Sequence, residues 1–239
     1  MKVLKRKFKL LIVSYLTIVC MIGIVGQLHG QQYKLSVGSN ITKFNYINSE
    51  GAPIDFMKSG SGNRFSVGSE FRILDTTKLV SSTSERAIYF SSRPRLAKML
   101  SMLKYDVSLE SNQYNAVGDV QNIAFSYQTS YLGASGGFGV HVPIRYGISI
   151  SLQGRLAGQK IIQGNQQIGQ KFYDLTVDEQ FKNIQFMYGY SGEIQKRLGE
   201  KLDAFLSYQY LTTQHGQQAG VATLNLVPTT ISFGIKILK

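Results

Sequence analysis

The chain has 239 residues, enough for one ordinary domain, and 17% of them are charged, against about 25% in typical water-soluble domains. Five of its 26 basic residues lie within 2–9, so the rest of the chain carries 21 basic and 14 acidic residues, a net charge of +7. This excess forms no basic stripe, which argues against nucleic-acid binding, and a mean hydropathy of -0.06 argues against a helical membrane protein.

Residues 1–30 have the three-part pattern of a secretory signal peptide. The basic residues are followed by the apolar run LLIVSYLTIVCMIGIVG (10–26) and then by small or polar residues. Cleavage after Gly30 would leave 31–239 as the exported domain. A retained inner-membrane anchor is the alternative, because the apolar run is only slightly shorter than the about 20 residues of a spanning helix.

The chain's one cysteine, Cys20, lies inside this apolar run. A lipoprotein anchor at Cys20 is disfavoured, because Val19 stands before it where a small residue is expected. The exported domain therefore has no disulfide and no cysteine metal site. No other stretch approaches 18 consecutive apolar residues, so any membrane-spanning segment of that domain must be a strand.

The exported domain alternates apolar and polar residues with a period of two, in segments suited to tilted spanning strands. In one of them, Ile184, Phe186 and Tyr188 share a face opposite Gln185 and Glu193. Such alternation predicts an all-β fold, a closed antiparallel transmembrane β-barrel of about eight strands. The predicted strands are 33–47, 64–73, 105–110, 123–142, 148–156, 183–194, 202–212 and 230–237.

The segment 123–142 is longer than the others and changes phase along its length. Phe125 and Tyr127 hold one phase, and Phe138 and Val140 hold the other. The change falls within the glycine-rich residues 133–137. This predicts a single-residue bulge there, which would turn the later side chains to the opposite face without ending the strand.

The connections alternate in length. Tight turns at 143–147 and 197–201 lie between longer polar loops at about 48–62, 113–122, 164–180 and 213–226, which is typical of periplasmic turns and external loops. The exception is the connection 75–103, which is long although its place in the alternation calls for a short turn. Within it, RAIYFSS (86–92) is a candidate extra strand and RLAKMLSMLK (95–104) a candidate amphipathic helix. The barrel would have ten strands if both 86–92 and 97–103 were strands.

A water-soluble β-sandwich or lipocalin-like barrel is the competing fold. It would also alternate, but its apolar face would point into the core. The export signal, the aromatic residues near strand ends and the charges on the polar faces favour the membrane barrel.

The polar faces of the strands carry eight charged residues that we expect inside the barrel. An eight-stranded barrel is just wide enough for side chains to fill its interior. We therefore expect a buried network of paired charges in preference to a conducting or ligand-binding channel. The eight residues are Glu70, Arg72, Asp106, Glu110, Arg155, Glu193, Asp203 and Lys236.

Few residues suggest chemistry. His141 is interpreted as a lumen or rim residue and His215 as an exposed loop residue. The acidic patch at 174–179 is interpreted as a solvated loop, and GASGGFG (133–139) lacks the Lys-Ser/Thr ending of a nucleotide-binding loop. No serine–histidine–acid set stands out. We therefore expect no enzymatic activity, no cofactor and no metal.

Three regions resemble the small outer-membrane β-barrel proteins common in Bacteroidetes, the PorT-like family. They are YKLSVGSNITKF (33–44), YLGASGGFGVHVPI (131–144) with GISISLQGRLAG (147–158), and YGYSGEIQKRLGEKLDAFLSYQYL (188–211) with TTISFGIKIL (229–238). The resemblance covers most of the exported domain and implies an outer-membrane barrel. It does not imply the secretion role of the member that names the family. The chain departs at its end, Ile237-Leu238-Lys239, where such barrels often finish on an aromatic residue.

The sequence thus predicts an exported outer-membrane barrel with a non-enzymatic structural, adhesion or envelope-assembly role. Transport or protein-secretion support, through a narrow channel or beside a secretion machine, is the first alternative. A lipid-modifying enzyme is the second. The expected partners are outer-membrane lipid and lipopolysaccharide, with envelope proteins as further candidates, and the oligomeric state stays open.

Overall fold

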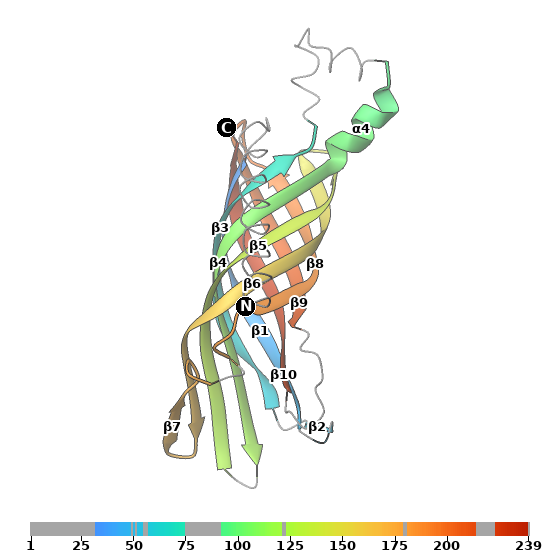
Figure 1. The fold of residues 1–239 in the computed structure, drawn as a ribbon. Helices are drawn as coiled ribbons and strands as arrows, with labels where there is room; N and C mark the ends of the chain where they lie inside the picture. The colour runs from blue at the N-terminus through green and yellow to red at the C-terminus, as the bar shows by residue number, and fades with distance from the viewer. Residues whose placement is uncertain are drawn as a thin grey trace, which may run out of the picture.

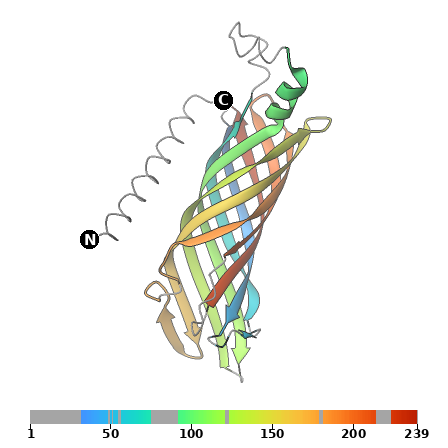
Figure 2. The same cartoon turned by 45° about the vertical axis from the view of Figure 1, so that its right-hand side comes forward.

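The computed structural model describes residues 32–238 except 49, 51, 55–56, 75–91, 121–122, 179–180 and 214–222. The predicted signal peptide, most of the candidate strand 86–92, and His215 lie outside the described residues. Eight long antiparallel strands form the wall of one barrel (Figures 1 and 2). They are β1 (Gln32–Ile47), β3 (Met57–Arg72), β4 (Leu103–Val120), β5 (Ile123–Pro143), β6 (Ile148–Ile168), β8 (Gln185–Arg197), β9 (Leu202–Thr213) and β10 (Thr223–Leu238).

Each long strand pairs with its neighbours along the chain, and the last strand returns to the first. β1 and β10 pair along their whole length, from Gln32 opposite Leu238 to Ile47 opposite Thr223. Two short strands, β2 (Pro53–Ile54) and β7 (Lys171–Asp174), pair with β1 and β6 outside this ring. The predicted eight-stranded antiparallel barrel is therefore confirmed. Among the described residues, no helix is long and apolar enough to cross a bilayer.

The end of the barrel with the two tight turns, here called the turn-side end, lies at the top of Figure 1. In the first turn Ile144 N–H donates to Ile148 O at 2.9 Å, and Tyr146 and Gly147 have positive φ of 56° and 71°. The helix α4 (Pro94–Met102) lies beyond this end and leads into β4. It confirms the predicted amphipathic helix at 95–104, and 97–103 is therefore not part of a tenth strand.

Apolar side chains cover the outside of the barrel near the turn-side end. In β1 the outward apolar residues run from Tyr33 to Ile41, and in β6 they run from Ile148 to Leu156. The next charged outward residues are Lys43 and Lys160. This outward band has the 9–11-residue height that a tilted strand needs to cross a bilayer. The strands themselves are 12 to 21 residues long, so they continue well past the band.

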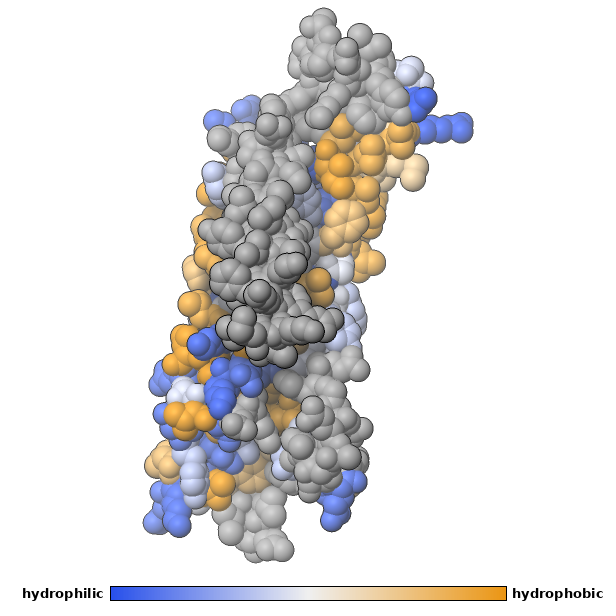
Figure 3. Space-filling view, viewed as in Figure 1, coloured by the Kyte–Doolittle hydropathy of each residue, from blue (hydrophilic) through white to orange (hydrophobic). Residues whose placement is uncertain are grey.

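Beyond the band the two faces of the wall exchange polarity. Tyr114, Tyr131 and Leu211 point inward there and are almost fully buried, whereas Ser111 and Gln128 are exposed on the outside. A polar outer face over an apolar interior is the arrangement of a water-soluble β-barrel, and it is suited to water outside the distal half. In Figure 3, apolar surface lies along the upper and middle flanks, and hydrophilic surface gathers near the lower end.

The exchange of polarity explains why apolar residues change phase along 123–142, where the sequence predicted that the strand itself changes phase. β5 keeps one phase throughout: Phe125, Tyr131 and His141 all face inward, and Leu132 and Phe138 face outward. The predicted glycine bulge at 133–137 is therefore wrong.

The irregularity lies in β6 instead. Ser130 pairs with Gln163 and Tyr131 pairs with Ile161, so Ile162 is the extra residue. The predicted loops at 113–122 and 164–180 are also shorter than expected, because β4 extends into the first, β6 extends into the second, and β7 lies within the second.

Candidate functional site

Buried ion pairs cross the interior of the turn-side half. The first group, here called the lysine–glutamate cluster, consists of Lys34, Glu70, Lys104, Glu193 and Lys236. Lys104 Nζ lies 2.8 Å from Glu70 Oε2 and 3.5 Å from Glu193 Oε1. Lys236 Nζ lies 2.8 Å from the same Glu70 oxygen and also contacts Glu193, and Lys34 Nζ lies 2.5 Å from Glu193 Oε2. The five residues come from β1, β3, β4, β8 and β10, so the cluster links strands across the lumen.

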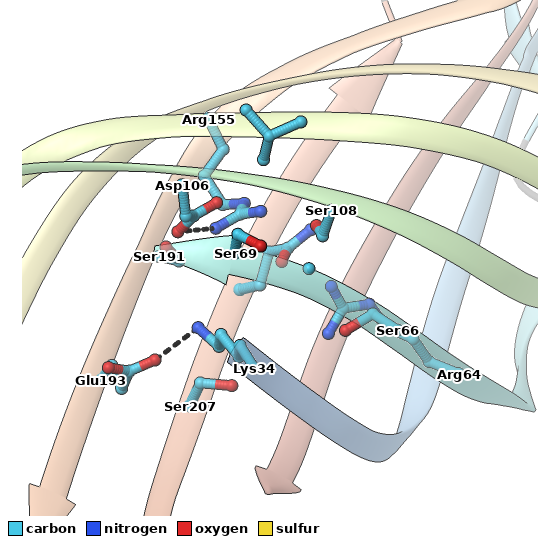
Figure 4. Close-up of a pocket in the computed structure, with 13 residues that line it drawn as sticks. Lys34, Arg64, Ser66, Ser69, Asp106, Ser108, Arg155, Ser191, Glu193 and Ser207 are labelled. Atoms are coloured by element: carbon cyan, nitrogen blue, oxygen red, sulfur yellow. Dashed lines mark hydrogen bonds and ion pairs between the residues drawn. The ribbon is translucent and has the colours of Figure 1, made fainter. Parts of the chain in front are cut away.

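The second group, here called the arginine–carboxylate cluster, consists of Arg64, Asp106, Glu110 and Arg155. Arg64 Nη2 lies 2.6 Å from Glu110 Oε1, and Arg155 Nη1 lies 3.1 Å from Asp106 Oδ2. Arg155 Nη2 is 3.7 Å from Glu110, which also accepts a hydrogen bond from Ser135 Oγ at 2.5 Å. Figure 4 shows Arg155 and Asp106 facing each other, with Lys34 and Glu193 paired nearby.

The two clusters balance most of the charge that they bury. The lysine–glutamate cluster has three cations and two anions, and the arginine–carboxylate cluster has two of each. An ion buried without a partner costs several kcal/mol, so these pairings are a condition for placing the charges inside. Between the clusters lies a cavity of ≈ 20 Å³, lined by Lys34, Arg64, Asp106, Arg155 and Glu193 among others, which is room for about one water molecule.

Gly137 makes space for the contact between Arg155 and Asp106. It lies on β5 directly opposite Arg155 and faces the lumen. A Cβ atom at this position would lie 3.1 Å from Arg155 Nη1 and 3.3 Å from Asp106 Oδ1. The absence of a side chain at Gly137 therefore lets the guanidinium and the carboxylate meet beneath β5.

The structure distributes the eight predicted lumen residues over three places. Glu70, Glu193 and Lys236 belong to the lysine–glutamate cluster; Asp106, Glu110 and Arg155 belong to the arginine–carboxylate cluster. The remaining two lie nearer the turn-side end. Asp203 accepts a hydrogen bond from Gln195 Nε2 at 2.5 Å and lies 3.6 Å from Arg197 Nε. Arg72 is only partly buried and lines a pocket at that end.

Lys34, Arg64 and Lys104 complete the clusters and were absent from the predicted set. The alternation carries the signal for all three. Lys34 is in phase with the inward Ser36, and Lys104 is in phase with Asp106. Arg64 lies on the polar face of its own predicted strand.

The distal half is filled by apolar side chains. Tyr114 and Tyr131 rings lie 5.3 Å apart at its centre, and Tyr114 Oη donates to Gln159 Oε1 at 2.9 Å. Leu175 and Phe181, from the segment after β7, are buried in the same group. The interior beyond the ion pairs is therefore a packed core.

His141 and Ser151 form a buried pair between β5 and β6, with His141 Nδ1 3.0 Å from Ser151 Oγ. A catalytic triad would also need a carboxylate hydrogen-bonded to the imidazole, and no such bond occurs in the described parts of the chain. No group of three or more potential metal-ligating side chains comes together in those parts either. The sequence placed His141 at the lumen or rim, and the structure adds Ser151 as its partner.

A basic pocket of ≈ 470 Å³ opens at the turn-side end, between α4 and the 143–148 turn. Its described lining residues include the cations Arg72, Lys98, Arg145 and Arg197 and neither Asp nor Glu. The nearly buried His141 and Ser149 lie on its inner wall.

No known protein-family model matches the chain, and no curated protein matches its sequence. Similar solved structures include neisserial surface protein A, at 11% identity and a TM-score of 0.43, covering 87% of this chain and 99% of that one. Another is Ail, the attachment invasion locus protein of Yersinia pestis, in complex with a heparin analogue (12% identity, TM-score 0.35, 88% and 100% covered). A third is the outer-membrane protease OmpT from Escherichia coli (7% identity, TM-score 0.45, 89% and 98% covered). Identities this low concern the fold alone.

The last of these corrects the expectation that the chain is not an enzyme. OmpT, one of the solved structures to which this chain is similar, is an outer-membrane protease. Catalysis depends on a few side chains that a fold carries, and the same fold hosts unrelated functions. The scarcity of histidine and cysteine is thus no ground for excluding an activity.

Proposed function

We propose that this protein is exported by its N-terminal signal, inserts in the outer membrane, and serves adhesion or envelope assembly through the part that projects beyond the bilayer. Membership of the PorT-like family is part of the proposal and is supported by the three sequence regions quoted above. The turn-side end is periplasmic in this arrangement, because short turns face the periplasm in such barrels.

The observation that carries the proposal is the distal core. A barrel that only anchors itself needs strands of about 9–11 residues. Here β4, β5 and β6 have 18 to 21 residues and enclose a second, apolar interior beyond the membrane band. Burying residues such as Tyr114 and Tyr131 makes the projection a rigid surface in place of loose loops.

The outer face of this projection is suited to contacts with a polar partner. On β4 and β5, Gln113 pairs with Ser130 and Asn115 pairs with Gln128, so amide and hydroxyl groups lie side by side. Ser61 follows on β3, where its carbonyl accepts a hydrogen bond from Asn115. Such a surface offers hydrogen-bond donors and acceptors beside the exposed lysines Lys58 and Lys160 of the same half.

The two ion-pair clusters and the distal core argue against transport as the role. Ions would have to pass paired charges, a space for about one water, and then buried aromatic side chains. We therefore expect little or no ion conduction by the purified protein in planar bilayers. Steady channels of large conductance would reject this proposal and favour the transport alternative.

The adhesion role is tested with whole cells. Cells that express the protein should aggregate, or bind immobilised glycans and matrix proteins, more than cells without it. Gln113→Arg with Gln128→Arg changes the outer face of the projection and should reduce this gain. Lys196→Gln with Lys201→Gln, at the turn-side end, serves as the control and should preserve it. Equal adhesion with and without the protein would refute the role.

A further inference from the structure

We infer that the basic pocket at the turn-side end binds the phosphate headgroup of an anionic phospholipid. This inference uses the membrane orientation given above and does not depend on the adhesion role. In that orientation the pocket faces the periplasmic leaflet. Its volume of ≈ 470 Å³ lies within the about 300–1,000 Å³ usual for small-molecule sites.

Among the described residues, most cations of the pocket have no carboxylate partner. Arg72 Nε is buried and has no hydrogen-bond partner among the described residues. Lys98 and Arg145 form no ion pair within the same part of the chain, and only Arg197 has a carboxylate nearby, Asp203 at 3.6 Å. In the lumen clusters, by contrast, every cation has a carboxylate partner. Like charges gathered at a low-dielectric boundary attract an anion from outside, and arginine suits a phosphate particularly well.

The pocket also has an apolar side that continues into the membrane band. Ile144 and Tyr146 are exposed at its edge, and Ile148 both lines the pocket and begins the outward apolar row of β6. A headgroup bound by the cations would therefore have its acyl chains beside Ile148 and Ile150. A free phosphate would use only the charged half of this site.

The helix α4 points to the same ligand. None of its residues is buried, although Leu96 and Met99 are apolar and exposed. Arg95 and Lys98 lie among them on the same helix. A basic amphipathic helix with an uncovered apolar face is typical of the bilayer interface, where anionic lipids attract it. In Figure 3, apolar surface lies at the upper right, where Figure 1 places α4, and continues down the same flank of the barrel.

The inference is tested by lipid retention on the full, folded chain in detergent, measured by native mass spectrometry. We expect phosphatidylglycerol to be retained much better than phosphatidylcholine. Lys98→Gln with Arg145→Gln should weaken the retention of phosphatidylglycerol about twenty-five-fold, at about fivefold for each charge. Both side chains are exposed, so the double variant should fold normally.

The matched control is Lys58→Gln with Lys160→Gln, which removes two exposed positive charges from the distal half. It should retain phosphatidylglycerol as the unchanged protein does. Equal retention of the two lipids, or an equal loss in both double variants, would overturn the inference. Displacement of the lipid by an equal concentration of glycerol phosphate would assign the pocket to a soluble phosphate and would overturn the lipid assignment. Failure of the adhesion assay would leave each of these results unchanged.

Discussion

Arg155→Met tests whether the buried charges of the lumen depend on their partners. Arg155 is the only cation within 4 Å of Asp106 among the described residues, whereas Glu110 also has Arg64. The substitution therefore leaves the Asp106 carboxylate buried, 3% exposed, and unpaired. Breaking a buried pair by removing one partner costs about 3–5 kcal/mol, which is a large part of a typical folding free energy.

The lysine–glutamate cluster provides the comparison. Without Lys236, Glu70 keeps Lys104 and Glu193 keeps both Lys34 and Lys104. The loss of Lys236 turns a cluster of three cations and two anions into one of two cations and two anions, whose charges balance. Lys236→Met should therefore cost clearly less than Arg155→Met, although Lys236 is the more deeply buried residue.

The assay is reversible urea unfolding of the barrel in lipid vesicles, with the free energy taken from linear extrapolation. Adding Asp106→Asn to Arg155→Met removes the stranded charge and should restore part of the loss. A loss of under about 1 kcal/mol for Arg155→Met would show that water solvates Asp106, because exposed pairs contribute that little. Equal losses for the two single variants would refute the role given to the remaining partners.

The remaining predictions concern a glycine, the lipid band and an exposed carboxylate. Gly137→Ala should destabilise the barrel by about 1–3 kcal/mol in the same unfolding assay, because its Cβ would crowd Arg155 and Asp106. Phe138→Arg, on the outward band of β5, should cost about 2–4 kcal/mol, whereas Gln128→Arg on the distal part of the same strand should change the unfolding free energy little. Hydrogen bonds from Thr176 hold the pKa of Asp174 below its usual value, so Thr176→Val should raise that pKa, as followed by NMR titration.

Each of these predictions has a contrary outcome. Gly192→Ala, where a Cβ meets no atom within 4 Å, is the control for Gly137→Ala, and equal losses would reject the crowding argument. Equal folded yields of Phe138→Arg and Gln128→Arg would place the lipid boundary elsewhere. An unchanged titration of Asp174 would mean that Thr176 does not stabilise its charged form. Since a lowered pKa stabilises the folded state above the ordinary pKa of Asp, this local contribution is lost as the pH falls through the lowered value.

The turn-side half was predictable because lipid and lumen require opposite side chains on alternate positions. Ile231, Phe233 and Ile235 alternate with Ser232 and Gly234 and lie on the face expected. The inward face of the distal half was not predictable, because alternation alone does not say which of the two faces points inward. Phe125 and Tyr131 are apolar on the inner face there, since the medium outside changes from lipid to water along a single strand.

The pairing of the charges required the strand register. Glu70 and Lys104 lie on neighbouring strands, but Glu70 and Lys236 are 166 residues apart and meet only across the closed lumen. The sequence shows that these charged side chains lie on the inward face of their strands. It does not show which of them pair with one another. The basic pocket is similarly assembled from β3, α4, β5, β8 and the 143–148 turn, which no local pattern brings together.

At the seam between β1 and β10, the final strand brings the last backbone pairing of the barrel together with Lys236, the third lysine of the lysine–glutamate cluster. Until β10 arrives, Glu70 and Glu193 have only one of the two lysines that contact both of them, Lys104, and β1 and β9 each present an unpaired edge. An open edge is costly within a bilayer, because backbone groups there find no water. Backbone pairing and charge pairing are thus completed by the same event. A nearly finished barrel should be much less stable than a closed one, which favours all-or-none insertion over the build-up of partly closed forms.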